Sequence, residues 1–313
     1  MALIDQTTAL PCTALGADAG GSKVHILMQD ATGIREREMP SVNLRRVSVD
    51  EAADKLAEAI TQALDGQPLA ADAVCCLGAA GAGTDAVATP LRESLSHELG
   101  LPTGQIIVTS DAQIAHRAAF GTDAGILIIA GTGSGCYAVS EEGFLLRAGG
   151  WGPGLEDPGS GSELGREAVK HLLSDLERGS MSRLSTAISE HLGLARPTIP
   201  AVLDAFYQPD FSAAQLAPVV LDALEAGDGH AATLVEHQVS ALARQAGRLA
   251  ATMSPAPRGI ALVGGLMTRD SYVEQLVQAL SQSLPHLTAS RATRTPAEGA
   301  LEWAATEQRR LSP

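Results

Sequence analysis

Aromatic residues are scarce in this sequence, at 3% of its 313 positions. The hydrophobic fraction is nevertheless 45%, which is ordinary for a globular protein. The core must therefore be built from Ala, Val, Leu and Ile. Because a single hydrophobic core stops growing near ~250–300 residues, a chain of this length is expected to form two lobes.

Positive charge is also in short supply. The 22 Lys and Arg residues stand against 36 Asp and Glu, which gives a formal net charge of −14 and a pI of about 4.9. Such a chain lacks the basic surface typical of proteins that bind nucleic acid or an anionic membrane, so we expect neither partner. An anionic ligand would have to be held locally, by backbone N–H groups or by a metal ion.

Cysteine is rare, with only Cys12, Cys75, Cys76 and Cys136 in the chain. No C-x-x-C pair occurs, and no Cys/His spacing suits a zinc site. Cys75 and Cys76 fall in an apolar run, where buried and inert thiols are the simplest interpretation. Neither a secretory signal nor a membrane-spanning apolar run is recognisable. We therefore expect a protein of the reducing cytoplasm.

Two segments share one layout: strand, Gly-rich turn, strand, x-x-Gly turn, strand. Each is predicted to form a three-stranded meander. The expected strands are 13–18, 23–30 and 34–40 in the first segment, and 125–130, 136–140 and 144–148 in the second. Helical periodicity and further short strands follow each meander. The repetition predicts an α/β protein of two related lobes, each opening with a meander.

The Gly-rich turns at Gly16–Lys23 and Gly131–Gly135 are candidate phosphate sites. A turn of this kind offers backbone N–H groups without side chains, so phosphate oxygens can approach closely. Neither turn matches a P-loop or a Rossmann fingerprint, because a strand follows where a helix is required. Each turn alone could be a plain hairpin. Their occurrence at the start of both meanders favours phosphate binding.

Two carboxylates stand at the ends of predicted strands. Asp18 ends the first strand beside a Gly-rich turn, where it could hold Mg²⁺, although a turn-capping role is the simpler alternative. Asp111 ends an apolar strand directly before a helix. It is well placed as a general base, although a helix N-cap is the common role for such a residue.

The segment 149–161 contains many glycines and one large aromatic, Trp151. Its composition is unsuited to a core and is typical of a ligand-binding loop. A long connecting loop is the alternative.

Taken together, these segments resemble motifs of the N-acetylglucosamine kinase/BadF ATPase family. They are Gly16–Lys23 (first phosphate motif), Ser110–Ala112 (connecting segment with the base), Gly131–Ser134 (second phosphate motif), Gly149–Gly161 (sugar-binding loop), Val263–Leu266 (adenosine motif) and Pro296–Ala300 (start of the last helix). The motifs follow the family order from residue 16 to residue 300.

Departures from the family pattern concern the first turn and the sugar loop. Ala19 stands where a third Gly is usual, and Glu156 and Pro158 flank Asp157 where the family has Gly and Glu. The change leaves room for a different sugar or altered contacts. Glu156 would suit the free ammonium of glucosamine, whereas the family resemblance points to the acetylated sugar.

The resemblance implies a two-lobed actin-like ATPase (ribonuclease H-like) fold with lobes 1–112 and 113–295, each with helices around a central sheet. The last helix, 296–313, would pack back onto the first lobe. It implies an ATP-dependent kinase that phosphorylates an amino sugar, N-acetylglucosamine or glucosamine, at the 6-hydroxyl with Mg²⁺. Asp111 would be the catalytic base, and Asp18 would hold the metal. The implied ATP-binding residues are Asp18, Gly20, Gly21, Ser22, Lys23, Gly131, Thr132, Gly133, Ser134, Gly264 and Gly265. The implied sugar-binding residues are Asn43, Gly81, Asp111, Gly150, Trp151 and Asp157.

Two other functions are compatible with the same fold. One is an ATPase activator of a 2-hydroxyacyl-CoA dehydratase, which needs exposed Cys ligands for a bridging iron–sulfur cluster. Cys136 lies in the appropriate half of the chain for that role. The other is a non-catalytic sugar-sensing protein on a kinase scaffold. The oligomeric state is left open, with a homodimer among the alternatives.

Overall fold

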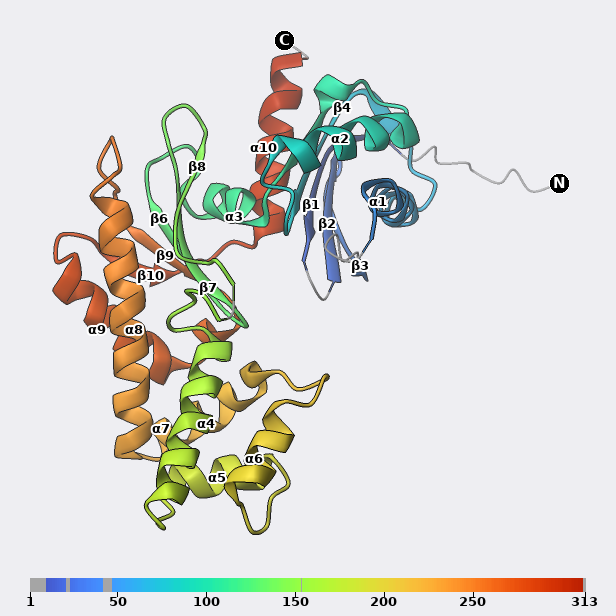
Figure 1. Ribbon diagram of the computed structural model, residues 1–313. Coiled ribbons are helices and arrows are strands. Elements are labelled where there is room, and N and C mark those ends of the chain that lie inside the picture. Colours follow the sequence, from blue (N-terminus) through green and yellow to red (C-terminus); the bar gives the residue numbers. More distant parts are fainter. Residues whose placement is uncertain (1–9, 21–22, 42–46, 153, 312–313) are drawn as a thin grey trace. The chain divides into compact units, whose positions relative to one another are not determined.

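The computed structural model describes residues 10–311 except 21–22, 42–46 and 153. The chain divides into two compact units (Figure 1). Unit 1 comprises residues 1–123 and 292–313, and unit 2 comprises residues 124–291. Unit 1 therefore includes the whole helix at residues 111–120, whereas the expected boundary at residue 112 assigned most of this helix to the second lobe. That helix packs against the C-terminal helix of unit 1.

The elements of unit 1 are β1 (Cys12–Ala19), β2 (Lys23–Asp30), β3 (Gly33–Pro40), α1 (Val49–Leu64), β4 (Leu69–Ala79), α2 (Asp85–Leu99), β5 (Ile106–Thr109), α3 (Asp111–Phe120) and α10 (Pro296–Leu311). Those of unit 2 are β6 (Ile126–Ala130), β7 (Ser134–Val139), β8 (Leu145–Ala148), α4 (Gly161–Glu177), α5 (Arg183–His191), α6 (Ile199–Phe206), α7 (Ala217–Glu225), α8 (Gly229–Ala250), β9 (Ile260–Val263), α9 (Asp270–Ser283) and β10 (Ala289–Arg291).

The two units share one sheet topology. Unit 1 has the strand order β3-β2-β1-β4-β5, and unit 2 has the corresponding order β8-β7-β6-β9-β10. In each sheet the first three strands form an antiparallel meander, and the remaining two run parallel to its first strand. The duplication that the sequence predicts is therefore present at the level of topology.

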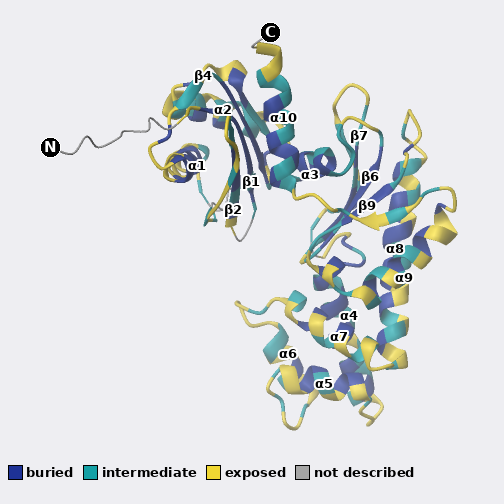
Figure 2. Cartoon of the chain, turned by 180° about the vertical axis from the view of Figure 1, so that it is seen from behind, coloured by how far each residue is buried: buried dark blue, intermediate teal, exposed yellow. Residues whose placement is uncertain are grey.

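Both faces of the unit 1 sheet are covered. α1 and α10 lie on opposite sides of it, and the central strands are buried (Figures 1 and 2). Along β1 and β4 successive residues enter different cores: Cys75 packs with α1 and α2, whereas Cys76 packs with α10. Burial raises the pKa of both thiols, as expected for inert cysteines.

Close backbone contact fixes α10 against β1. A Cβ atom on Gly16 would lie 2.1 Å from the backbone nitrogen of Leu301. Only glycine permits this approach, because any larger residue would push the helix away from the strand. The C-terminal helix, which begins at Pro296, thus packs onto the unit whose first strand begins at Cys12.

Unit 2 has its own core between the sheet and helices α4, α8 and α9. Buried residues line the inward faces of these helices, and the outward faces are exposed (Figure 2). α5, α6 and α7 extend from α4 as a helical layer. Within the described ranges, no helix combines the length and the apolar character needed to cross a bilayer.

Candidate active site

The first group of predicted residues lies at one edge of the unit 1 sheet. β1, β4 and β5 are parallel, and their register places Asp18 beside Gly78, and Gly78 beside Thr109. The carboxyl ends of the three strands therefore meet at the same edge. Asp111 follows β5 directly, so it shares this edge with Asp18. Ligands of open α/β sheets bind at the carboxyl ends of the strands.

The surroundings of Asp18 disfavour the ionised form of its carboxyl group. Burial raises its pKa to about 6, and the negative charge of Asp111 adds to the effect, whereas His25 and Lys23 oppose it. Two carboxylates that repel one another in a partly buried site favour either a proton or a bound cation. The pair is thus suited to a metal ion.

Asp111 is not the N-cap of α3. That role belongs to Ser110, whose Oγ accepts a hydrogen bond from the backbone nitrogen of Gln113 at 3.2 Å. Asp111 is the first helical residue, and its Oδ1 lies 2.9 Å from the backbone nitrogen of Ala112. The helix dipole stabilises a negative charge at this position. The capping alternative therefore does not account for Asp111.

The other unit 1 candidates lie around this edge. Gly20 follows β1, and its carbonyl oxygen accepts a hydrogen bond from Ser41. Lys23 begins β2, and its exposed side chain forms an ion pair with Glu38. Gly81 lies in the exposed turn after β4. Predicted residues Gly21, Ser22 and Asn43 lie outside the described residues.

In unit 2, two predicted nucleotide-binding turns converge at the carboxyl ends of β6 and β9. Gly131 follows β6, and Gly264 follows β9, its parallel neighbour. Gly264 has a φ of 115°, and a Cβ atom on it would lie 2.2 Å from the carbonyl oxygen of Ala130. Only glycine fits such a conformation and such a close approach. The turns predicted to bind phosphate and adenosine are distant in sequence but adjacent in the structure.

The predicted sugar loop adjoins the same phosphate turn. Asp157 is 5% exposed, and its Oδ1 accepts a hydrogen bond from the backbone nitrogen of Gly152 at 3.0 Å. Its Oδ2 lies 3.0 Å from the position that a Cβ atom on Gly133 would occupy. Ser134 Oγ donates a hydrogen bond to the carbonyl oxygen of Pro158 at 2.7 Å. Thr132 is exposed at the tip of the turn.

Side chains far away in the sequence hold this loop. Tyr272 on α9 is fully buried, and its hydroxyl donates to the carbonyl oxygen of Gly159 at 2.6 Å. Gln238 on α8 accepts a hydrogen bond from the backbone nitrogen of Gly159 at 3.1 Å. The sequence interpretation missed both residues. Tyr272 is one of only 3 tyrosines in the chain, and this scarcity was the available signal.

Trp151 is 56% exposed, which leaves it free for a ligand. Arg147 on β8 lies over its ring, with the Arg147 Cζ 3.7 Å from the ring centroid. The preceding Gly150 is packed against Tyr137 on β7: a Cβ atom on Gly150 would lie 2.7 Å from the Tyr137 hydroxyl oxygen. Arg147 and Tyr137, directly paired across the two strands, were also missed by the sequence interpretation.

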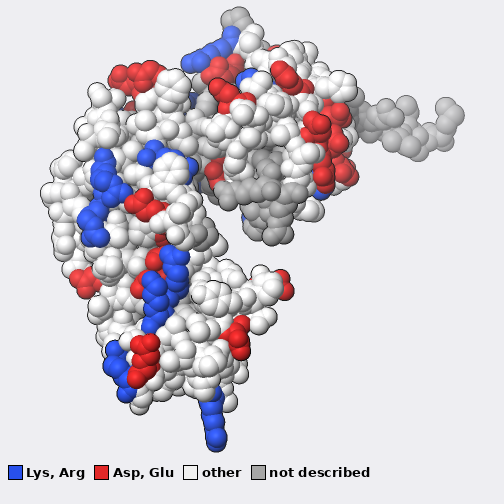
Figure 3. Space-filling model, in the orientation of Figure 1, with Lys and Arg blue, Asp and Glu red and all other residues white. Residues whose placement is uncertain are grey.

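Charged residues of both signs are interspersed on the described surface shown in Figure 3.

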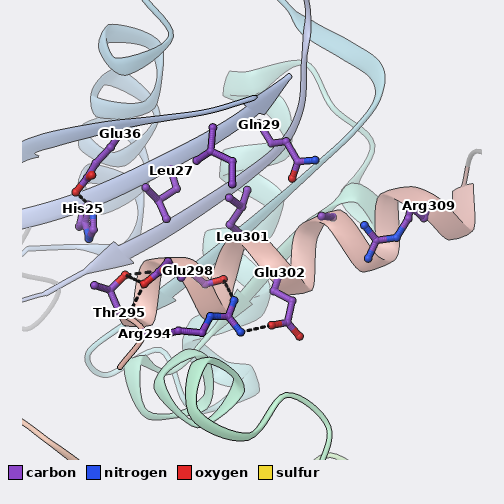
Figure 4. Close-up of a pocket in the computed structure, with 12 residues that line it drawn as sticks. His25, Leu27, Gln29, Glu36, Arg294, Thr295, Glu298, Leu301, Glu302 and Arg309 are labelled. Carbon is purple, nitrogen blue, oxygen red and sulfur yellow. Dashed lines mark hydrogen bonds and ion pairs between the residues drawn. The ribbon is translucent and has the colours of Figure 1, made fainter. Parts of the chain in front are cut away.

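A separate pocket of about 550 Å³ lies on unit 1 between β2, β3 and α10 (Figure 4). His25 and Glu36 meet there at 2.6 Å, and Arg294 pairs with Glu302 at 2.6 Å. None of the residues predicted for ATP or sugar lines this pocket. Its volume alone therefore does not mark it as the active site.

The repeated sheet, with carboxylates and Gly-rich turns at the carboxyl ends of its strands, defines the actin-like, ribonuclease H-like class of α/β fold. Within this class, the chain belongs to the BadF/BadG/BcrA/BcrD ATPase family, whose model matches residues 15–304. The family membership predicted from the motifs is confirmed.

A curated relative is the N-acetylmuramic acid/N-acetylglucosamine kinase of Clostridium acetobutylicum, 35% identical over 185 residues. The match covers 58% of this chain and 60% of that relative, so the chain spans about 60% of the length of the relative.

Two solved structures show the same fold. One, proposed to be an N-acetylglucosamine kinase from Chromobacterium violaceum, has a TM-score of 0.71 and 23% identity, and covers 93% of this chain and 98% of its own. The other is a ROK family glucokinase from Streptomyces griseus in complex with glucose and AMPPNP, with a TM-score of 0.59 and 19% identity. It covers 94% of this chain and 99% of its own. The predicted fold class is confirmed.

Proposed function

We propose that this protein is an ATP-dependent kinase that phosphorylates an amino sugar, N-acetylglucosamine or glucosamine, at the 6-hydroxyl. The observation that carries the proposal is Asp111. This carboxylate follows β5 at the edge of the sheet where β1 ends at Asp18 and Ala19, and the capping of α3 is done by Ser110 instead. Family membership and the kinase named among its relatives support the proposal.

The residues present fit ATP and Mg²⁺. Burial and, to a lesser extent, repulsion from Asp111 raise the pKa of Asp18, and a bound cation would stabilise the ionised form. Asp18 would hold Mg²⁺, which when bound would neutralise charge on the triphosphate. The backbones of Gly20–Lys23 and Gly131–Ser134 would bind phosphate oxygens. Gly264 and Gly265 would form a wall against the adenosine.

In the proposed reaction Asp111 accepts the proton of the sugar 6-hydroxyl. The hydroxyl oxygen forms a bond to the γ-phosphorus, the bond from that phosphorus to the bridging oxygen breaks, and ADP leaves. Phosphoryl transfer requires mainly positioning and charge stabilisation. Asn43, Gly81, Gly150, Trp151 and Asp157 would hold the other groups of the sugar.

The contacts of Glu156 favour the acetylated sugar. Its carboxylate could have served as the partner of a free ammonium, but its Oε1 lies 3.0 Å from Nη2 of Arg248. The charge of Glu156 is therefore already matched by an arginine. Trp151 remains available to pack against an apolar group such as the acetyl methyl.

The dehydratase activator is the less well supported function. All four cysteines are buried, and Cys136 is fully so. Burial raises the pKa of Cys136 to about 12, whereas a cluster ligand must be an accessible thiolate. Iron and sulfide analysis of anaerobically purified protein tests this alternative directly. A homodimer and a cytoplasmic location stay predictions.

The test of the proposed function is sugar-dependent ADP release, followed by determination of the phosphorylated position by ³¹P and proton NMR. We expect ADP and sugar 6-phosphate in equal amounts. ADP release that does not respond to any amino sugar would contradict the proposal. Amino-sugar binding without any turnover would instead indicate the sugar-sensing protein.

A further inference from the structure

Arg147 makes three contacts with the start of the sugar loop. It stands near the end of β8, and its Nε donates a hydrogen bond to the carbonyl oxygen of Gly149 at 3.2 Å. Its Nη2 donates to the carbonyl oxygen of Gly150 at 2.7 Å. The same guanidinium lies over the Trp151 ring, with Cζ 3.7 Å from the centroid. One side chain thus engages three successive residues.

The backbone that Arg147 engages needs such support. Gly149 and Gly150 both have a φ of 73°, a conformation that glycine adopts readily and that it also leaves readily. Trp151 itself is more than half exposed, so its side chain is not fixed by burial. Tyr137 lies close to Gly150, because a Cβ atom on Gly150 would be 2.7 Å from the Tyr137 hydroxyl oxygen. The Arg147 guanidinium contacts both the backbone of this turn and the indole ring.

The chemistry of this contact is specific to arginine. A planar guanidinium can donate from Nε and Nη2 in a fixed fork while its face stacks on an indole. A lysine ammonium keeps the charge but has neither the fork nor the flat face. Because the guanidinium covers one face of Trp151, a ligand can pack only on the opposite face.

We propose that Arg147 is a positioning residue that holds Trp151 in the orientation needed to bind the face of the sugar. The inference rests on the proposed function, because it assumes that Trp151 contacts the sugar. It assigns Arg147 no part in ATP binding or in proton transfer. Loss of Arg147 should accordingly raise the KM for the sugar and leave the KM for ATP unchanged.

The test compares Arg147→Ala and Arg147→Lys with Arg244→Ala. Arg244 is a suitable control because it is exposed on α8 and has no hydrogen-bond or ion-pair partner among the described residues. For both Arg147 variants we expect the sugar KM to rise about tenfold, with the KM for ATP and the Tm unchanged. Arg244→Ala should behave as the wild type. An unchanged sugar KM in Arg147→Ala, or full activity in Arg147→Lys, would overturn the proposal.

A second readout does not depend on catalysis. The chain has 2 tryptophans, so the Trp303→Phe background reports Trp151 alone. In that background Arg147→Ala should increase acrylamide quenching of Trp151 and weaken the fluorescence change produced by N-acetylglucosamine. Identical quenching would overturn the inference even if the protein is a kinase. If the wild type binds the sugar without phosphorylating it, the kinase proposal fails while loosened Trp151 and weakened sugar binding still support Arg147.

Discussion

Asp18 and Asp111 lie at the same edge of the unit 1 sheet, and the charge of Asp111 contributes to raising the pKa of Asp18 to about 6. Burial of Asp18 is the larger cause. At neutral pH the ionised pair therefore lowers the free energy of unfolding of the ligand-free protein. Such an arrangement is common where a protein holds charged groups for a ligand rather than for stability.

Asp18→Asn should stabilise the metal-free protein at pH 7.5. The folded-state pKa is about 6, against an ordinary value of 3.8. Stability therefore falls as pH rises from about 4 through 6, and the ionised group costs roughly 3 kcal/mol above that range. Thermal melts should show a higher Tm for the variant at pH 7.5 and little difference at pH 4. Asp54→Asn, at an exposed position on α1, is the control. A lower Tm for Asp18→Asn at pH 7.5 would contradict this account.

The same Asp18→Asn variant should need more Mg²⁺ for half-maximal rate, because the neutral amide is a weaker ligand. Sugar binding should be unaffected. Titration of Mg²⁺ against initial rate measures the effect. An unchanged metal dependence would remove Asp18 from the metal site.

Substitutions at the adjacent residues Ser110 and Asp111 should have different effects, one on stability and the other on turnover. Asp111→Asn should keep the Tm and lower turnover by roughly 10²–10⁴-fold, because a general base is lost. Ser110→Ala should lose about 1 kcal/mol of stability with its cap and keep turnover at temperatures below its Tm. Both variants need turnover and melting measurements. If Asp111→Asn loses only a fewfold in turnover while remaining folded, Asp111 is not the base.

Alanine substitutions at the neighbouring residues Gly264 and Gly265 form a variant and its control for the proposed adenosine-binding turn. Gly264→Ala places a Cβ 2.2 Å from the Ala130 carbonyl oxygen at a φ of 115°, whereas a Cβ on Gly265 meets nothing within 4 Å. Gly264→Ala should lose at least ~1–2 kcal/mol of stability and raise the KM for ATP. Gly265→Ala should keep its stability. Equal Tm values for the two variants would show that the turn relaxes freely.

Much of the fold could be predicted because its signals are local. The strand–turn–strand layouts around Gly20 and Gly131 determined both meanders. Helix α1 begins at Val49, directly after its N-cap Ser48, whose Oγ accepts a hydrogen bond from the backbone nitrogen of Glu51. Shared topology of the two sheets followed from the repeated layout. Parallel pairing then placed Asp18 and Asp111 at one edge.

The supporting residues could not be predicted, because their partners are distant or ambiguous in sequence. Tyr272 lies 113 positions from Gly159, the residue to which it donates. Arg147 is an exposed arginine near the end of a strand, and nothing in its neighbours indicates that it stacks on Trp151. The choice between Ser110 and Asp111 as the cap depends on a shift of one residue, which sequence patterns rarely resolve.

The most direct test of the central claim is kcat/KM, measured with ATP under one set of conditions for glucose, glucosamine, N-acetylglucosamine and N-acetylmuramic acid. A site that hydrogen-bonds a polar group rejects an analogue that lacks it, because its own buried partners are left unpaired. We predict that N-acetylglucosamine is preferred over glucose, and over glucosamine because Arg248 already pairs with Glu156. Equal values for glucose and the amino sugars, or ATP hydrolysis without phosphorylation of any sugar, would contradict the account.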